Sequence, residues 1–201
     1  MSVETLMSLR GAQHGKGISE FIILKNVLSF IFSITALLLV SSCMTAQQIP
    51  QTHDMHVISD VPFFPQEEYQ CGPASLASVL TYWNIHAEPE EIGRKIFSTS
   101  ARGTLTIDMM LYAQKKGLHV EQFKGTMEAL RNYIDSGYPL IVLVDYGISF
   151  FQMNHFMVVT GYSNSGVIVH SGQFQNKLLL EKVFLAAWKK TDYWTLLIKK
   201  P

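Results

Sequence analysis

The order in which hydrophobic patterns follow one another constrains the fold of this 201-residue chain most. From Gly72 to Trp83, apolar residues recur on one face at helical spacing, and further helix-start and helix-end signals follow up to Gly137. After residue 140 the apolar runs are rich in β-branched residues, and the run 163–166 has the composition of a hairpin turn. Helices that precede a mostly antiparallel sheet indicate an α+β domain.

The individual elements follow from local signals. Pro89 suits the first turn of a helix, Thr126 is a typical N-cap, and Gly117 and Gly137 are typical residues after a helix end. We therefore expect helices over 72–83, 88–97, 106–116, 127–136 and 180–189. We expect strands over 118–123, 140–144, 155–162, 167–170 and 193–198.

The N-terminal 56 residues read as targeting sequence rather than fold. The apolar run 27–40 follows Lys25 and is short for a membrane span, as in a signal peptide. Its end, Leu39-Val40-Ser41-Ser42-Cys43, resembles the lipobox of bacterial lipoproteins, which implies lipidation of Cys43 and, with Met44 following, an outer-membrane location facing the periplasm. The alternative is an uncleaved signal anchor. We expect a signal peptide over 1–43, a flexible tether over 44–56 and one domain over 57–201.

Charge and motifs exclude several classes of function. Beyond Cys43 the chain holds 13 Lys and Arg against 14 Asp and Glu, so it has no basic excess for a nucleic-acid partner. The run Gly15-Lys16-Gly17 lacks the hydroxyl and the strand of a phosphate-binding loop, and the chain has no ATP-binding motif. We expect neither a cofactor nor a metal ion.

Cys71 stands where an extended segment gives way to the first helix. The amide groups and dipole of a helix N-terminus favour the thiolate, which is the nucleophilic form of cysteine. With Cys43 lipidated, Cys71 is the one thiol left in an exported domain, which is either a reactive group or a buried bystander. We therefore consider a catalytic cysteine first and a small buried residue second.

A cysteine nucleophile requires a base and an oxyanion donor, and the sequence offers one of each. His155 begins an apolar strand, from which its side chain can reach a helix N-terminus packed alongside. Gln66 lies five residues before Cys71 and carries an amide donor. Taken alone, His155 is more often a satisfied strand residue and Gln66 a polar turn residue.

Together these segments match a known pattern. The run from Val61 to Gln66, Cys71-Gly72-Pro73-Ala74, and the run from His155 to Tyr162 resemble the bacteriocin-processing, double-glycine leader cysteine peptidase family. The resemblance covers about residues 57–200. It implies a papain-like fold with N-terminal helices packed on an antiparallel sheet, Cys71 as nucleophile, His155 as base and Gln66 as oxyanion residue. It also implies a peptide or protein substrate.

One position departs from the family pattern. Where the family usually has Asp-Pro, this chain has Ser171-Gly172, and a serine hydroxyl orients an imidazole without supplying charge. We expect a cysteine enzyme to tolerate this better than a serine enzyme, because a Cys/His ion pair exists before substrate arrives. Other residues considered as substitutes for the acid are His170, Asn164 and Asp145.

Two functions remain open at this point. The first is a lipid-anchored cysteine peptidase acting through a Cys71 thioester. The second is a catalytically weakened papain-like module that binds peptide or peptidoglycan at the cell envelope. In that case the aromatic run 146–151 would line the groove, although a core or lid role suits the same run.

Overall fold

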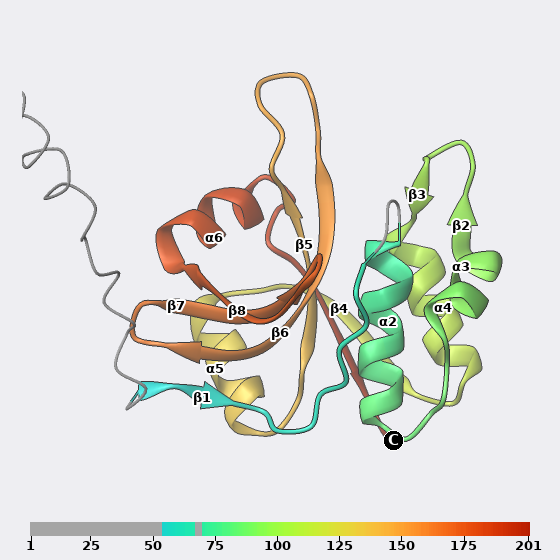
Figure 1. Ribbon diagram of the computed structural model, residues 1–201, viewed down its shortest axis with the longest axis horizontal. Helices are drawn as coiled ribbons and strands as arrows, with labels where there is room; N and C mark the ends of the chain where they lie inside the picture. The colour runs from blue at the N-terminus through green and yellow to red at the C-terminus, as the bar shows by residue number, and fades with distance from the viewer. Residues whose placement is uncertain (1–53, 67–69) are drawn as a thin grey trace, which may run out of the picture. The chain divides into compact units, whose positions relative to one another are not determined.

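Residues 54–66 and 70–201 of the computed structural model are described here, and they form five helices and nine strands (Figure 1). The predicted signal peptide, Cys43 and all but the last three residues of the predicted tether lie outside them. The helices are α2 (Cys71–Tyr82), α3 (Pro89–Ile96), α4 (Thr106–Lys115), α5 (Met127–Asp135) and α6 (Glu181–Lys189). The strands are β1 (His56–Val57), β2 (Phe97–Ser98), β3 (Gly103–Thr104), β4 (His119–Lys124), β5 (Leu140–Asp145), β6 (Asn154–Ser163), β7 (Gly166–Ser171), β8 (Phe174–Leu180) and β9 (Trp194–Lys199).

The predicted helix ends are confirmed by their local geometry. The Thr126 hydroxyl accepts a hydrogen bond from the Ala129 amide at 3.1 Å, which satisfies one free donor at the start of α5. Gly117 follows α4 with a φ of +82°, a conformation that glycine adopts without steric cost. Pro89 occupies the first turn of α3, where its missing amide hydrogen costs nothing.

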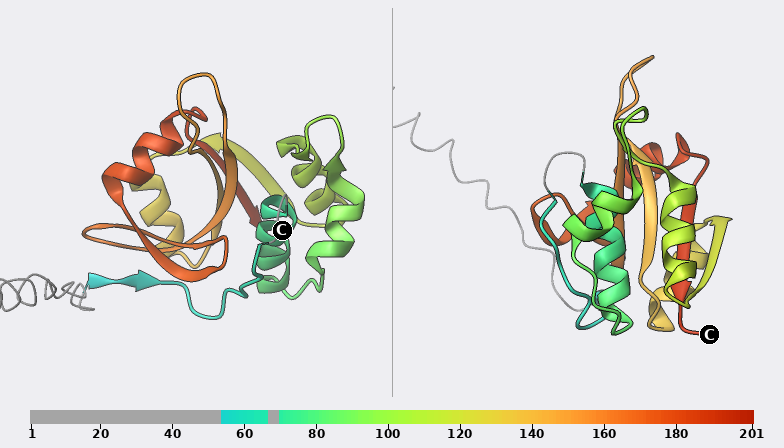
Figure 2. Two further views of the ribbon diagram at one scale, coloured as in Figure 1. Left: turned by 45° about the horizontal axis from the view of Figure 1, so that its top comes forward. Right: turned by 90° about the vertical axis from the view of Figure 1, so that its right-hand side faces the viewer.

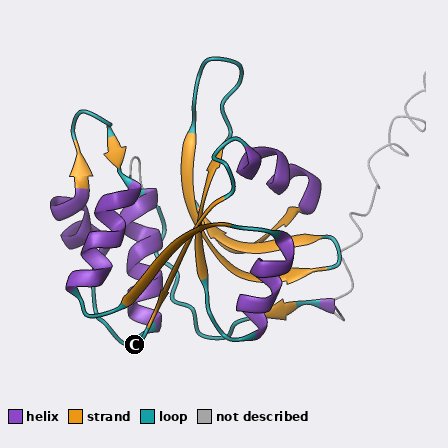
Figure 3. Cartoon of the chain, turned by 180° about the vertical axis from the view of Figure 1, so that it is seen from behind, coloured by secondary structure: helices purple, strands orange, loops and turns teal. Residues whose placement is uncertain are grey.

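One antiparallel sheet organises the domain. Its strand order is β4-β9-β5-β6-β7-β8, and β1 pairs with β6 at His56 and Val57. Figure 1 shows α2, α3 and α4 together on one side of the central strands and α5 and α6 on the other, and the view from behind agrees (Figure 3). The predicted α+β fold, with helices packed on an antiparallel sheet, is confirmed.

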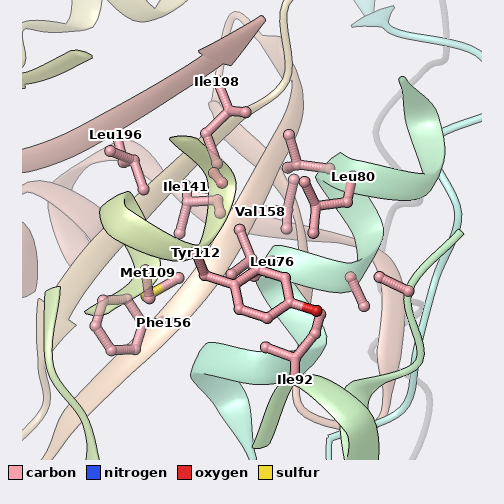
Figure 4. Packing of buried hydrophobic residues seen from close by; sticks show 14 of the residues in the cluster. Leu76, Leu80, Ile92, Met109, Tyr112, Ile141, Phe156, Val158, Leu196 and Ile198 are labelled. Atoms are coloured by element: carbon pink, nitrogen blue, oxygen red, sulfur yellow. The ribbon is translucent and has the colours of Figure 1, made fainter. Parts of the chain in front are cut away.

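The central strands are apolar on both faces, which explains their continuous hydrophobic runs. Ile141, Val158 and Leu196 pack with Leu76 and Leu80 of α2, as the close view of this cluster shows (Figure 4). The intervening residues of the same strands pack in a second cluster with the helices on the other side: Leu140, Val142, Met157, Val159 and Leu197 with Leu130, Phe184 and Trp188. Burial on both sides fixes the register of β5 and β6, because a slip by one residue would exchange the two faces.

Four strands lie outside the segments that the sequence analysis assigned to strands. β8 was not predicted, because its first four residues are exposed and give no alternating pattern, and its last residue, Leu180, was placed in the following helix. β2 and β3 form a two-stranded hairpin outside the main sheet. β1 places His56, expected in the tether, in the sheet, where its ring stacks on Tyr162 at 4.6 Å.

Within residues 54–66 and 70–201, no helix has the length and hydrophobicity needed to cross a membrane.

Candidate active site

Cys71 is the first residue of α2, and its surroundings are those of an open helix N-terminus. The side chain of the N-cap residue Gln70 makes no capping hydrogen bond, so it leaves the first amides of the helix unoccupied. The backbone amides of Phe156, Gly72 and Cys71 itself lie within hydrogen-bonding reach of the sulfur. Gly72 is required here because Thr104 of β3 packs directly over it, leaving only 2.7 Å between the Thr104 side chain and an added Cβ.

The protonation state of Cys71 differs from the expectation. Burial raises the pKa of the thiol above its ordinary value of 9.0, and this effect exceeds the lowering of the pKa by the three amides. The helix N-terminus was expected to favour the thiolate, but loss of water around the sulfur outweighs it. The direction of this shift favours the thiol over the thiolate.

His155 is the second residue of β6 and faces Ser171 at the end of β7. Its Nε2 lies 2.9 Å from the Ser171 hydroxyl, and Nδ1 is the ring nitrogen that does not take part in this contact. Burial lowers the pKa of His155 below 6.5, and the nearby cation Lys177 lowers it further. The directions of both pKa shifts oppose the expected Cys/His ion pair, because each favours the neutral form of its group.

Gln66 is fixed by hydrogen bonds to the turn after Ser171. The side-chain oxygen Oε1 accepts from the Gly172 backbone amide at 2.9 Å. The backbone amide of Gln66 donates to the Gly172 carbonyl, also at 2.9 Å. Its Nε2 is thereby directed toward α2, with Ser75 Oγ at 3.4 Å and the Phe156 carbonyl at 3.5 Å. These two contacts are long, which leaves a donor with capacity for a stronger acceptor.

Gln66, Cys71 and His155 line one cleft of about 600 Å³. One wall is the segment 101–105 at the β3 end of the β2–β3 hairpin, and the other is the segment 152–156 leading into β6. The β2–β3 hairpin and the β5–β6 loop project in the same direction in both Figure 1 and Figure 2. Ser171 joins the group through its contact with His155, so the structure brings together all four residues expected to be catalytic.

The residues considered as substitutes for the missing acid have other partners. Asp145 Oδ1 accepts hydrogen bonds from the Gly147 and Met153 amides, both at 2.7 Å, which lowers the pKa of this carboxyl. His170 bonds the Val61 carbonyl through Nε2. Asn164 donates to Asp54. Ser171 is thus the one side chain with a hydrogen bond to His155 among the residues that the structure describes.

A comparison of the sequence with protein-family models identifies a peptidase family. The model of the Peptidase_C39-like family matches residues 58–194, well over half of the chain. This chain belongs to the Peptidase_C39-like family. Its domain is a papain-like cysteine peptidase domain, as the resemblance implied. No curated protein matches the chain.

Solved structures support the fold of this C39-like domain. A protein from Bacillus anthracis described as C39-like is 16% identical with a TM-score of 0.61, covering 74% of this chain and 98% of its own. The peptidase domain of Streptococcus ComA, a bifunctional ABC transporter of a quorum-sensing pathway, is 24% identical with a TM-score of 0.58, covering 70% and 99%. A double-glycine motif protease of an AMS/PCAT transporter, solved with its leader peptide, is 20% identical with a TM-score of 0.58, covering 75% and 96%.

Two features of the C39-like site were missed by sequence reasoning. Lys177 influences His155 because β8 pairs with β7, and β8 itself was not predicted. Thr104 forms a wall of the cleft through a hairpin of two-residue strands, which is too short for a periodic signal. Recognising 174–180 as an edge strand would have placed Lys177 beside the end of β7.

Proposed function

We propose that this protein is a cysteine peptidase that hydrolyses a peptide bond through a thioester at Cys71, with His155 as general base. The observation that carries the proposal is the arrangement in one cleft of a helix-start thiol and an imidazole whose Nε2 is already engaged by Ser171. The engaged nitrogen fixes the ring, so that the other nitrogen, Nδ1, is available for proton transfer.

The first step begins from two neutral groups. In the tautomer that suits a base, His155 Nε2–H donates to Ser171 Oγ and Nδ1 carries a free electron pair. Nδ1 takes the Cys71 proton as the sulfur attacks the carbonyl carbon, so the carbon–sulfur bond forms while the imidazole becomes positively charged. The amides around Cys71 stabilise the negative charge as the sulfur loses its proton.

The same attack turns the carbonyl oxygen into a tetrahedral oxyanion, which requires hydrogen-bond donors. The Gln66 Nε2 and the amides at the start of α2 provide hydrogen atoms directed toward the cleft. His155 Nδ1–H then protonates the leaving amine, which breaks the carbon–nitrogen bond and leaves the thioester. Water then attacks the thioester carbon while the again neutral His155 takes a proton from it. The carbon–sulfur bond breaks, the peptide leaves as its carboxylic acid, and His155 returns the proton to the Cys71 sulfur.

A peptide is the substrate that fits this chemistry. The related AMS/PCAT protease was solved with a leader peptide, which supports an extended peptide or protein as the occupant of the equivalent cleft here. The lining of the cleft combines backbone groups of Gly103 and Gly172 with the side chains of Leu105 and Met153. Arg102, Gln152 and Asn154 add polar side chains to this lining, so the cleft can bind both the main chain and the side chains of a peptide.

The test is covalent labelling with a peptidyl chloromethyl ketone at pH 7, with the modified residue identified by mass spectrometry. We expect labelling at Cys71 in the folded protein, loss of labelling in Cys71→Ala, and loss in His155→Ala. His86→Ala is the matched control, because this histidine is 84% exposed and lies outside the cleft. Labelling that is absent, or that survives His155→Ala unchanged, would exclude the peptidase.

A second function is favoured by one observation. His155 contacts a serine rather than a carboxylate, and both members of the catalytic pair are neutral at rest. A module that binds peptide or peptidoglycan without cleaving it needs no more than this cleft. The two functions are separated by Cys71→Ser expressed at the natural level: a binding module retains its cellular effect, whereas a peptidase loses it.

Anchoring is a separate part of the proposal. The lipobox-like end of the run 39–43 supports lipidation of Cys43 and a position at the cell envelope, at the periplasmic face of the outer membrane. Metabolic labelling with an alkyne fatty acid tests it. We expect incorporation into the full chain and none into Cys43→Ser, and incorporation into neither would favour the uncleaved signal anchor.

A further inference from the structure

The loop between β5 and β6 carries the most exposed large apolar side chains among the described residues. Ile148 is 81% exposed, Phe150 96% and Phe151 82%. Three such side chains within four residues are unusual on the surface of a soluble protein, where large apolar residues are usually exposed singly. The loop extends well beyond the ends of the neighbouring strands in Figure 1, Figure 2 and Figure 3.

The loop is held in this projecting form by specific bonds. Asp145 accepts hydrogen bonds from Gly147 and Met153, one on each arm of the loop. Lys190 of the segment after α6 donates to the Gly147 carbonyl at 2.7 Å. The Phe151 amide donates to the Ile148 carbonyl at 3.2 Å and closes the tip. The side chains are therefore exposed by a defined structure rather than by lack of one.

The tip is separate from the catalytic cleft. Gln152 and Met153 line the cleft, whereas Ile148, Phe150 and Phe151 do not. The aromatic run 146–151 was expected to line the groove or to belong to the core or a lid, and the exposure of its tip excludes the core. Because the three side chains lie outside the lining of the cleft, we expect an occupant other than the substrate peptide to cover them.

The size of the tip argues against a protein partner. Three side chains of this size offer roughly 500 Å² of apolar surface, whereas a stable protein interface needs about 800 Å² from each partner. A second copy of the chain bound through this tip alone would therefore not persist. A lipid bilayer has no such lower limit, because each apolar group that enters it contributes independently.

The chemistry of the loop suits the membrane interface. From Tyr146 to Asn154 no residue carries a charge, and aromatic side chains concentrate where acyl chains meet headgroups. The apolar run that ends at Val40 is joined to Asp54 by thirteen residues, which span at most about 50 Å. This distance exceeds the diameter of a domain of this size, roughly 40 Å, so the chain length permits the tip to reach a bilayer that holds the N-terminal run.

We propose that the β5–β6 loop inserts Ile148, Phe150 and Phe151 into the interface of a phospholipid bilayer. This contact would fix the orientation of the domain on the membrane, with the mouth of the cleft beside the lipid surface. It does not depend on catalysis, since none of the three side chains touches the site.

The test uses the full chain with Phe150→Trp on vesicles of phosphatidylethanolamine and phosphatidylglycerol whose acyl chains are brominated. We expect the tryptophan emission to shift to shorter wavelength and to be quenched beyond the background of the native tryptophans. The matched control is Leu111→Trp, an exposed position on α4 that is 45% accessible. We expect no such shift or quenching there.

A second variant makes the result specific to the tip. Adding Phe151→Asp to Phe150→Trp should abolish the shift and the quenching, because a carboxylate resists transfer from water. Equal quenching of Phe150→Trp and Leu111→Trp would overturn the proposal. So would a shift that requires added peptide or a second copy of the protein and occurs without vesicles.

Discussion

The two sides of the catalytic cleft differ in how completely they are built. On the helix side, Cys71 has an uncapped helix start, three nearby amides and a glycine that admits a close neighbour. On the strand side, His155 has a neutral hydroxyl for a partner and Lys177 in place of a negative charge. The proposed nucleophile therefore has its supporting groups, whereas Ser171 gives the proposed base no negative charge to stabilise its protonated form.

This difference indicates how the site operates. A buried thiol with a raised pKa and an imidazole with a lowered pKa do not exchange a proton before substrate binds. In the proposed mechanism the proton therefore moves during the attack, and Ser171 supplies no negative charge to stabilise the imidazolium that forms. We therefore expect a slow enzyme whose rate rises when negative charge is added beside His155.

The largest effect is expected for the group that bridges the two sides. Gln66→Ala should lower kcat by about 10²–10³, as for removal of one oxyanion donor. Hydrolysis of a peptide substrate measures this, and Gln173→Ala is the control, since this exposed side chain donates to the Gln66 backbone carbonyl and does not line the cleft. An equal loss in both variants would assign Gln66 a structural role instead.

Restoring the missing charge should raise the rate. Ser171→Asp is expected to increase kcat/KM by about tenfold or more, because a carboxylate stabilises the imidazolium. It should also raise the pKa of His155 and move the acidic limb of the pH–rate profile to higher pH. The control Ser171→Ala removes the hydrogen bond without adding charge and should lower the rate. If Ser171→Asp is no faster than the natural protein, the strand side is not the limiting side.

Removing the cation on β8 should have a smaller effect in the same direction. Lys177→Gln eliminates the charge that helps to lower the pKa of His155, so the acidic limb should move to slightly higher pH, with a few-fold change in rate at most. Lys182→Gln, on the exposed surface of α6, is the control. An unchanged limb would show that burial alone sets the pKa.

The smallest effect concerns stability. His170 Nδ1 accepts from the Asn176 amide and Nε2 bonds the Val61 carbonyl, an arrangement that only the neutral ring allows. Burial lowers the pKa of His170 below 6.5. The unfolded chain then binds the proton more readily, so stability is complete above pH 6.5 and falls as the pH drops below it. Urea unfolding at pH 8 and pH 5 measures the loss, which should be smaller in His170→Gln; an equal loss would implicate other groups.

Sequence alone predicted the framework of the fold because its signals are local. The apolar runs of β5 and β6 are buried on both faces, and Thr126, Gly117 and Gly137 mark helix ends in the structure as they do in the sequence. β8 has no such pattern, because it is the last strand of the sheet and its first residues face solvent. An edge strand is defined by its neighbour, which sequence does not display.

The same distinction applies to the site. Local context made Cys71, His155 and Gln66 candidates, the family resemblance added Ser171, and the structure places the four residues together. The raised pKa of Cys71 could not be predicted from the sequence. The helix start is visible there, whereas the burial of the sulfur depends on β3 and β6. The exposure of Phe150 and Phe151 depends in the same way on tertiary contacts. Asp145 accepts a hydrogen bond from the Gly147 amide, and Lys190 donates one to the Gly147 carbonyl.

The most direct test of the neutral resting pair is the rate of iodoacetamide alkylation at Cys71 as a function of pH, with the site confirmed by mass spectrometry. Iodoacetamide reacts with thiolate, so its rate reports the ionisation of this residue in the free protein. The account predicts one rise with a midpoint above pH 9, the ordinary value for the thiol. A plateau of rapid alkylation between about pH 5 and 8, as for a thiolate–imidazolium pair, would contradict it.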